Sequence, residues 1–403
     1  MNHRYHSLQP TMPFTDSVRR KTLTAVLLVG AAFVLFAVNG YAGLQAESPA
    51  VVGYGTVDSN GTVRVPALAI PLSSYMSEEA RHAFIREQKG MAETRAESGG
   101  YKTFINAPID QQRQRVDDGF RPQVERTKAA YPVNIKEQEI AGVRTDVVEP
   151  KRGVSPRNRD RVLISLHGGG YGYSSGGLAR VIEALPVAGY AKIKVVSVDY
   201  RMSPKYKWPA AIEDVIAVYQ ALLKQYKPEN IGIYGCSTGG TLTANVVAWL
   251  QKQKLPRPGA IGIFCDGAVQ DGIGEAGDSK YFATAMSGWP IPAPDKPWAD
   301  VFGPETYAPY MEGTDAHDPL VAPIVSLDVL SRFPPTLLIS GTRDLCLSAA
   351  LYTHSRLVKA GVEADLHVWD GMWHGFYFDV DLPESKEAYE VMTKFFDKHL
   401  GQG

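Results

Sequence analysis

Short apolar or β-branched runs alternate with helix-length amphipathic stretches along most of the chain, from Asn134 to the C-terminus. The apolar runs are VRTDVVEP, RVLISLHG, IKVVSVDY, IGIYG, AIGIFCDG, PTLLISGT and ADLHVWDG. Strands that are separated by helices pair in parallel and bury both faces of their sheet under those helices. The pattern therefore predicts an α/β fold with a mostly parallel central sheet and helices on both faces.

A Pro- and Trp-rich segment, GWPIPAPDKPWADVFGPETYAPY, interrupts this alternation and predicts an insertion above the sheet at about residues 272–310. The main α/β domain is expected to span residues 131–403. Helical signals precede it in residues 71–130, where Ser77 can cap the start of a helix. This N-terminal segment is therefore expected to be helical.

Residues 1–42 have the features of an export signal. The basic stretch Arg19–Lys21 precedes the apolar run LTAVLLVGAAFVLFAV, and small residues follow at Gly40 and Ala42. This order is typical of a secretory signal peptide, while the length of the run also suits an uncleaved membrane anchor. Either interpretation places the remainder outside the cytoplasm, periplasmic, secreted or anchored facing outward. A linker is expected at residues 43–70, which are rich in Gly, Ser and Val.

The charge balance argues against a nucleic-acid partner, because 42 basic and 43 acidic residues leave a net charge of −1. Three cysteines, Cys236, Cys265 and Cys346, are too few and odd in number for a disulfide framework. No CxxC pair or clustered His and Cys spacing indicates a structural metal.

The stretch GCSTGG places two possible nucleophiles side by side between a predicted buried strand and a predicted helix. A Gly-x-Ser-x-Gly sequence at such a junction describes a sharp turn that exposes its central residue. Centring the turn on Ser237 puts Gly235 and Gly239 two residues before and after it. Centring it on Cys236 would put a tyrosine and a threonine there, whose Cβ atoms the turn disfavours. The geometry favours Ser237.

A serine nucleophile needs a base, and an acid that orients the base; without them the turn would carry no chemistry. In this strand–helix order the acid follows a later strand and the histidine comes last. PTLLISGTRD ends at Asp344, and the loop after ADLHVWDG holds His374. His367 is the competing base, but it lies within the strand pattern and is expected to be packed. Asp370 is the competing acid, but it follows the strand before the loop of His374 and precedes His374 too closely.

A third element is LISLHGGGYGY, in which Gly168, Gly169 and Gly170 close a predicted strand. Without side chains, their backbone N–H groups can point into a site. Two of them, together with the N–H of Thr238, would hold the oxyanion of a tetrahedral intermediate. A phosphate cradle is the alternative for a glycine run, but the lysine typical of a nucleotide-binding loop is missing.

The motifs HGGGY, VDYRMSPKYKWPAAIED, GCSTGG, DPLVAP, GTRD and WHGF, in this order, resemble the hormone-sensitive-lipase-like (bacterial esterase) family of α/β-hydrolases. The resemblance covers most of the chain from about Asn134 onward. It implies the α/β-hydrolase fold and a catalytic triad of Ser237, Asp344 and His374. It implies no metal and no organic cofactor.

The same resemblance implies oxyanion donors at Gly169, Gly170 and Thr238, with His167 as a structural anchor of their loop. It also implies a helical lid, built from the N-terminal region and from the insertion after the strand that ends at Cys265.

Two departures from the family pattern bear on substrate preference. Cys236 stands where the family usually has Asp or Thr before the nucleophile, and Leu345 and Cys346 follow the acid where Pro is frequent. Neither changes a triad residue. The resemblance therefore implies a serine carboxylesterase acting on small-molecule esters with short to medium acyl chains. Amide, carbamate or lactone hydrolysis would use the same groups, and a non-catalytic ligand-binding relative would typically lack the acid or the histidine.

Two groups of side chains leave alternatives open. Six aromatic residues near the proposed mouth either line an apolar pocket or form the lid core: Tyr171, Tyr173, Trp289, Trp298, Tyr307 and Tyr310. The three cysteines each end or follow a predicted strand, and those strands are expected to be neighbours. They are expected to be buried free thiols, with a disulfide between two of them as the alternative.

Overall fold

The computed structural model describes most of the chain: residues 55–57, 59, 62–65, 67–97, 103–104, 106–173, 177–269, 277–286 and 307–401. The chain divides into two compact units, Met1–Ala69 and Ile70–Gly403. Residues 1–42, for which the sequence predicts a signal peptide or membrane anchor, lie outside the described residues. Within the described ranges, no helix is both long and apolar enough to cross a membrane.

The first unit contains a short antiparallel ladder, in which β1 (Thr56–Val57) pairs with β2 (Val63–Arg64). The side chains of both strands are exposed, so this ladder buries no core of its own. It lies inside residues 43–70, where the sequence predicts a linker.

The second unit is built on an eight-stranded sheet with the strand order β10-β9-β8-β7-β5-β6-β4-β3. The six strands from β10 to β6 run parallel, whereas β4 is antiparallel to β6 and β3 is antiparallel to β4. The predicted mostly parallel sheet is therefore confirmed. The strands are β3 (Val133–Ile140), β4 (Val143–Pro150), β5 (Val162–Leu166), β6 (Lys194–Val198), β7 (Ile231–Cys236), β8 (Ala260–Phe264), β9 (Thr336–Arg343) and β10 (Ala364–Trp373).

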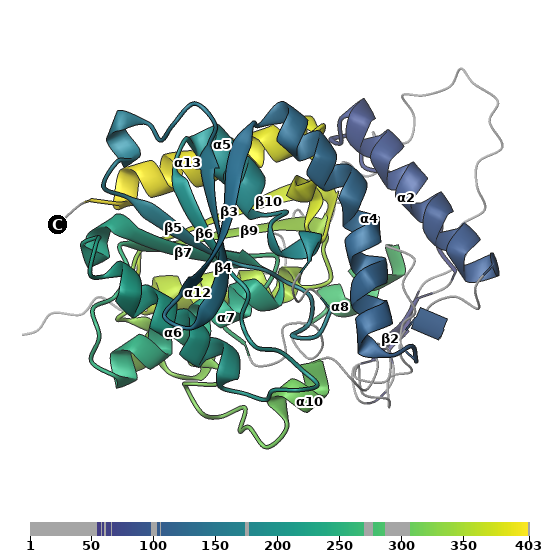
Figure 1. Cartoon of the computed structure of the whole chain (residues 1–403). Helices are drawn as coiled ribbons and strands as arrows, with labels where there is room; N and C mark the ends of the chain where they lie inside the picture. The colour runs from purple at the N-terminus through teal and green to yellow at the C-terminus, as the bar shows by residue number, and fades with distance from the viewer. Residues whose placement is uncertain are drawn as a thin grey trace, which may run out of the picture. The chain divides into compact units, whose positions relative to one another are not determined.

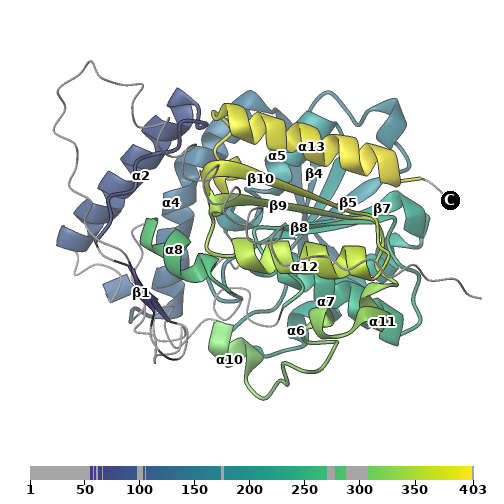
Figure 2. The same ribbon diagram turned by 180° about the vertical axis from the view of Figure 1, so that it is seen from behind.

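Helices cover both faces of this sheet, as predicted (Figures 1 and 2). One face carries α5 (Ala184–Ala191) and α13 (Pro383–His399), and the other carries α6 (Ala210–Leu222), α7 (Thr238–Lys252) and α12 (Leu347–Lys359). The shorter α-helices are α8 (Ser279–Met286), α10 (Tyr307–Met311) and α11 (Leu327–Leu330), and the 3-10 helices are η1 (Pro156–Asn158), η2 (Leu178–Arg180), η3 (Pro228–Asn230), η4 (Pro323–Val325) and η5 (Phe376–Phe378).

The apolar runs of the central strands supply two cores, one on each face. All residues of β5 are buried, and because successive side chains of a strand point to opposite faces, they divide between the two cores. Leu163 packs in the core under α5 and α13, while Ile164 packs in the core over α6 and α7. Burial on both faces explains why this strand reads as a continuous apolar run.

Two long helices, α2 (Glu78–Glu97) and α4 (Ile109–Ala130), form the segment before the sheet. Ser77 caps α2 as predicted: its hydroxyl accepts the Ala80 N–H at 3.1 Å. The Glu384 carboxylate of α13 in turn accepts the N–H of Ser77 at 2.7 Å and its hydroxyl at 2.9 Å. The start of α2 is thereby fixed to the main sheet domain.

The predicted insertion at 272–310 lies partly outside the described residues, which include only α8 and α10 from this region. Of the six aromatic residues, Trp289 and Trp298 fall outside them. Tyr171 and Tyr310 are buried and stack with ring centroids 4.2 Å apart. For this pair, the core alternative is the correct one.

The edge strand β10 differs from the sequence prediction at two residues, His367 and Asp370. His367 lies in the strand but is exposed, so the prediction that it is packed is wrong. The reason is its position on the outermost strand of the sheet, where fewer elements cover a side chain. Asp370 lies within β10 and does not follow it, and its carboxylate accepts the hydroxyls of Thr342, at 3.0 Å, and Ser73.

Candidate active site

The turn at GCSTGG connects β7 directly to α7, and Ser237 is the single residue between the two elements. Its backbone angles are φ 58° and ψ −133°. Such a positive φ is uncommon for a residue with a side chain and marks a strained turn. The strain is held by backbone hydrogen bonds: Ser237 N–H donates to Phe264 O at 2.8 Å, and Gly240 N–H donates to Ser237 O at 2.8 Å. This geometry fits the predicted nucleophile turn.

The two flanking glycines are needed because other backbone atoms come very close. A Cβ on Gly235 would lie 2.2 Å from Leu166 O, and one on Gly239 would lie 1.9 Å from the same oxygen. These distances are far inside van der Waals contact, so no other residue fits without moving the backbone. The packing therefore requires glycine two residues before and two residues after Ser237, which supports a turn centred on Ser237 and not on Cys236.

Cys236 is the last residue of β7 and is buried, with 1% of its surface exposed. Burial raises the pKa of its thiol to about 11. Only the thiolate is a strong nucleophile, so this thiol is unreactive at neutral pH. The half-buried Ser237 is the accessible member of the pair.

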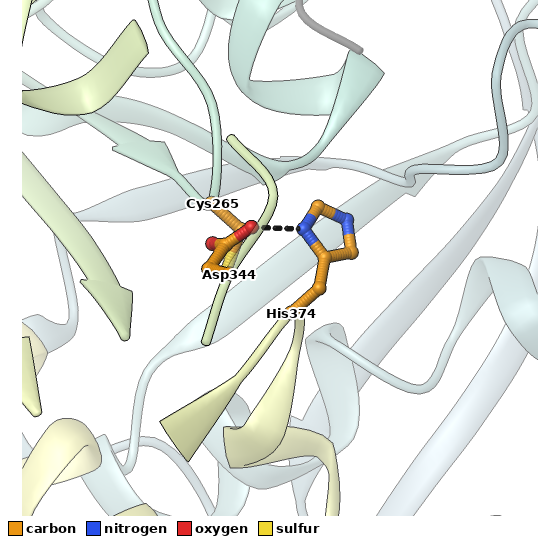
Figure 3. A group of neighbouring side chains, drawn as sticks. All are labelled: Cys265, Asp344 and His374. Atoms are coloured by element: carbon orange, nitrogen blue, oxygen red, sulfur yellow. Dashed lines mark hydrogen bonds and ion pairs between the residues drawn. The ribbon is translucent and has the colours of Figure 1, made fainter. Parts of the chain in front are cut away.

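Asp344 and His374 form a hydrogen-bonded pair at the carboxyl end of the sheet, with Nδ1 of the ring 2.7 Å from Oδ1 of the carboxylate (Figure 3). Asp344 directly follows β9 and is fully buried. Its carboxylate also accepts the Ser340 hydroxyl and the Cys346 N–H, each at 2.9 Å. Burial alone would raise the pKa of Asp344, but the charge of His374 and these hydrogen bonds hold the pKa below its ordinary value.

His374 follows β10 and has a side chain that is 30% exposed. Burial lowers the pKa of the imidazole, but the Asp344 carboxylate outweighs burial, and the net pKa is raised. Because Nδ1 faces Asp344, Nε2 is the nitrogen left to exchange a proton with another group. Among the described residues, neither Asp344 nor His374 is hydrogen-bonded to the Ser237 hydroxyl.

The glycine loop HGGG follows β5 and lies against the serine turn. A Cβ on Gly168 would meet Cys236 O at 2.9 Å and the Ser237 Cβ at 3.1 Å. Gly169 and Gly170 have φ of 106° and 60°, conformations that favour glycine. The predicted oxyanion loop and the predicted nucleophile are therefore in direct contact through their backbones.

His167 occupies the interior side of this loop. Its ring stacks on Tyr200 at a centroid distance of 4.2 Å, and the Tyr200 hydroxyl donates to His167 O at 2.5 Å. Burial lowers the pKa of His167 to about 4, so the ring is neutral at physiological pH. These contacts fit the structural role that the family resemblance implies for it.

Arg113 of α4 connects three segments around this loop and was missed by the sequence reasoning. Its guanidinium donates to Gly172 O and to Ser203 O, both at 2.8 Å. The N–H of Gly172 in turn donates to Gly169 O at 3.0 Å. An arginine in an amphipathic helix gives no sequence signal for such a tether, because its partners are backbone carbonyls distant in the chain.

The three cysteines lie at or just beyond the ends of the neighbouring strands β7, β8 and β9, as predicted, and all three are buried thiols outside any disulfide. The disulfide alternative is therefore not realised in this structure. The Cys236 and Cys265 side chains are close enough to affect one another's pKa. The expectation of buried, packed thiols is the correct one.

Cys265 also lies beside the Asp344–His374 pair (Figure 3). One potential metal-ligating atom of each of the three residues lies within 4.8 Å of the others. Burial raises the pKa of the Cys265 thiol well above its ordinary value, and its sulfur accepts the Gly375 N–H at 3.4 Å. Nδ1 of His374 and Oδ1 of Asp344 are already bonded to one another at 2.7 Å, so the group is better described as an acid–base pair packed on a thiol.

Comparison with known proteins agrees with this geometry. Residues 163–378, more than half of the chain, match the family of the alpha/beta hydrolase fold. An esterase from Acinetobacter venetianus is 24% identical over 306 residues, which cover 73% of this chain and 92% of the relative.

Solved structures give the same result. The crystal structure of an esterase E25 is similar with a TM-score of 0.68 and 30% identity, covering 84% of this chain and 98% of that chain. The crystal structure of an esterase from the bacterial hormone-sensitive lipase (HSL) family is similar with a TM-score of 0.63 and 27% identity, covering 79% of this chain and 98% of that chain.

Proposed function

The chain belongs to the hormone-sensitive-lipase-like family of α/β-hydrolases and is a carboxylic ester hydrolase, and we propose that it works through an acyl-enzyme on Ser237. The observation that carries this mechanism is the Asp344–His374 hydrogen bond at 2.7 Å, at the same sheet edge as the strained Ser237 turn. A positioned base beside a serine with this conformation is what acyl transfer requires.

In the first half of the proposed reaction, Nε2 of His374 takes the proton of the Ser237 hydroxyl while Oγ bonds to the ester carbonyl carbon. Asp344 holds Nδ1 and balances the positive charge that forms on the ring. The tetrahedral intermediate then collapses, and the protonated His374 gives its proton to the departing alcohol. In the second half, His374 deprotonates a water molecule whose oxygen bonds to the acyl carbon. The bond from that carbon to Oγ of Ser237 then breaks, His374 returns the proton to Oγ, and the carboxylic acid leaves.

The oxyanion formed in both halves is assigned to the N–H groups of Gly169, Gly170 and Thr238. Thr238 is the first residue of α7, so its N–H has no acceptor within the helix and lies at the positive end of the helix dipole. The contact between Gly168 and the Ser237 turn supports a common site for all three donors.

The substrate class is tested with p-nitrophenyl esters of increasing acyl chain length. We expect kcat/KM to be larger for acetate, butyrate and hexanoate esters than for the palmitate ester, since the family resemblance implies short to medium chains. The release of p-nitrophenol is measured at fixed pH, with the Ser237→Ala variant as the blank. Preference for palmitate would contradict the chain-length proposal, and hydrolysis of none of these esters would contradict the proposed reaction.

The pH dependence tests the role of His374. Only the neutral imidazole can accept the serine proton, so kcat/KM should fall as pH drops below the pKa of His374. Because this pKa is raised, the fall should lie above the ordinary value of about 6.5. The measurement is kcat/KM for a short-chain ester between pH 5 and 8. A flat profile would count against a histidine base.

A further inference from the structure

A second buried carboxylate lies at the same sheet edge as Asp344. Asp266 comes two residues after β8, and Asp344 comes directly after β9; these strands are parallel neighbours in which Phe264 pairs with Ile339. The side chain of Asp266 is fully buried. Adjacent parallel strands end at the same edge of a sheet, so both acids are delivered to the site.

The hydrogen bonds of Asp266 do not account for its burial. Its Oδ1 accepts the neighbouring Gly267 N–H at 2.8 Å. Its Oδ2 makes no hydrogen bond of normal distance and angle among the described residues, and neither does the buried Thr241 hydroxyl in the first turn of α7, which lies near enough to lower the pKa of Asp266. An unpartnered buried carboxyl oxygen is costly and needs a reason other than packing.

The charges around Asp266 couple this buried carboxyl to the Asp344–His374 pair. Burial raises the pKa of Asp266 to about 8, while the charge of His374 and the nearby Thr241 hydroxyl oppose this rise and the charge of Asp344 adds to it. In return, the Asp266 charge adds to that of Asp344 in raising the pKa of His374. Among the described residues, Tyr171 is a further titratable group near enough for the Asp266 charge to raise its pKa.

We propose that Asp266 is a second acidic positioning residue, which stabilises the His374 imidazolium from the strand next to that of Asp344. The proposal rests on the Ser237–His374 mechanism and adds one group to it. Asp344 orients the ring through a direct hydrogen bond, whereas Asp266 acts through space. It contributes only when it is ionised, and its effect therefore grows with pH.

The first test is the pH profile of Asp266→Asn, a variant that keeps the shape and removes the charge. In the wild-type protein, kcat/KM for a short-chain ester should rise twice, once with His374 and again near pH 8 as Asp266 ionises. The variant should keep the first rise and lose the second. The difference between the two proteins should be small at pH 6 and about tenfold at pH 9 for a partly screened charge pair.

A second variant covers the case in which Asp266→Asn does not fold. Thr241→Val removes the hydroxyl that favours ionised Asp266, so the second rise should move to higher pH while the first stays in place. A residue needed only for packing would lower the unfolding temperature without moving either rise. A single rise in wild type that both variants leave unchanged would overturn the proposal.

A double-mutant cycle separates this proposal from the mechanism on which it rests. The residual kcat/KM of Asp344→Asn at pH 9 should fall by about a further tenfold when Asp266→Asn is added. Equal activity of the single and double variants would refute a role for Asp266 and leave the Ser237 mechanism standing. Full activity of Ser237→Ala would instead refute the mechanism itself.

Discussion

Replacing Ser237 with alanine should lower kcat for ester hydrolysis by about 10⁴-fold or more, the loss typical of a removed serine nucleophile. The turn at Ser237 and the Asp344–His374 pair are expected to remain, since the serine hydroxyl makes no hydrogen bond among the described residues. The purified variant is assayed with a p-nitrophenyl ester, and its unfolding temperature should match that of the wild type.

Cys236→Ala is the matched control, because it removes the neighbouring candidate nucleophile from the same turn. We expect it to keep substantial activity, since its buried thiol has a pKa of about 11 and stays protonated. An organophosphonate probe should add mass to the peptide that contains Ser237 in this variant and not in Ser237→Ala. An inactive Cys236→Ala beside an active Ser237→Ala would reverse the assignment.

The sheet and the candidate triad could be predicted because their signals are local. Strands buried on both faces, such as β5, are apolar at every position, and this distinguishes them from the amphipathic helices between them. The Ser237 turn could be recognised because its glycines are imposed by backbone contacts, and only glycine satisfies them. Asp344 and His374 could be placed because a parallel sheet brings the ends of its strands to one edge.

The features that the sequence did not predict depend on contacts between distant segments. Arg113 reaches carbonyl groups 59 and 90 residues further along the chain, and a carbonyl group leaves no trace in the identity of its residue. Asp266 follows a strand, as Asp344 does, but only the folded structure shows its burial and its unpartnered oxygen. The exposure of His367 depends on which strand lies at the edge of the sheet, and strand order is not a local property.

Gly239→Ala is the substitution outside the triad for which we expect the largest effect. The new methyl group would lie 1.9 Å from Leu166 O and 2.8 Å from His167 O, and both are backbone atoms at the end of β5. Neither can rotate away, so either α7 must move or the glycine loop must move. Overpacking of a core typically costs about 1–3 kcal/mol, and a contact with rigid backbone should reach or exceed the upper end of that range.

The loss of activity in Gly239→Ala should exceed what the loss of folded protein explains, because the displaced segments carry Ser237 and the proposed oxyanion donors. A misplacement of about 1 Å can lower the rate about 100-fold, so kcat/KM per folded molecule should fall by at least that factor. The folded fraction is measured by circular dichroism during urea unfolding, and the rate is measured with a short-chain p-nitrophenyl ester.

Gly119→Ala in α4 is the matched control for the same chemical change. An added Cβ at Gly119 would meet no atom within 4 Å, and the residue is exposed in the middle of a helix. Alanine is favoured over glycine there by up to about 1 kcal/mol, so the control should be as stable as the wild type or more stable, with unchanged kcat/KM. If Gly239→Ala were as stable and active as Gly119→Ala, the close approach of α7 to β5 could not be what fixes the serine turn.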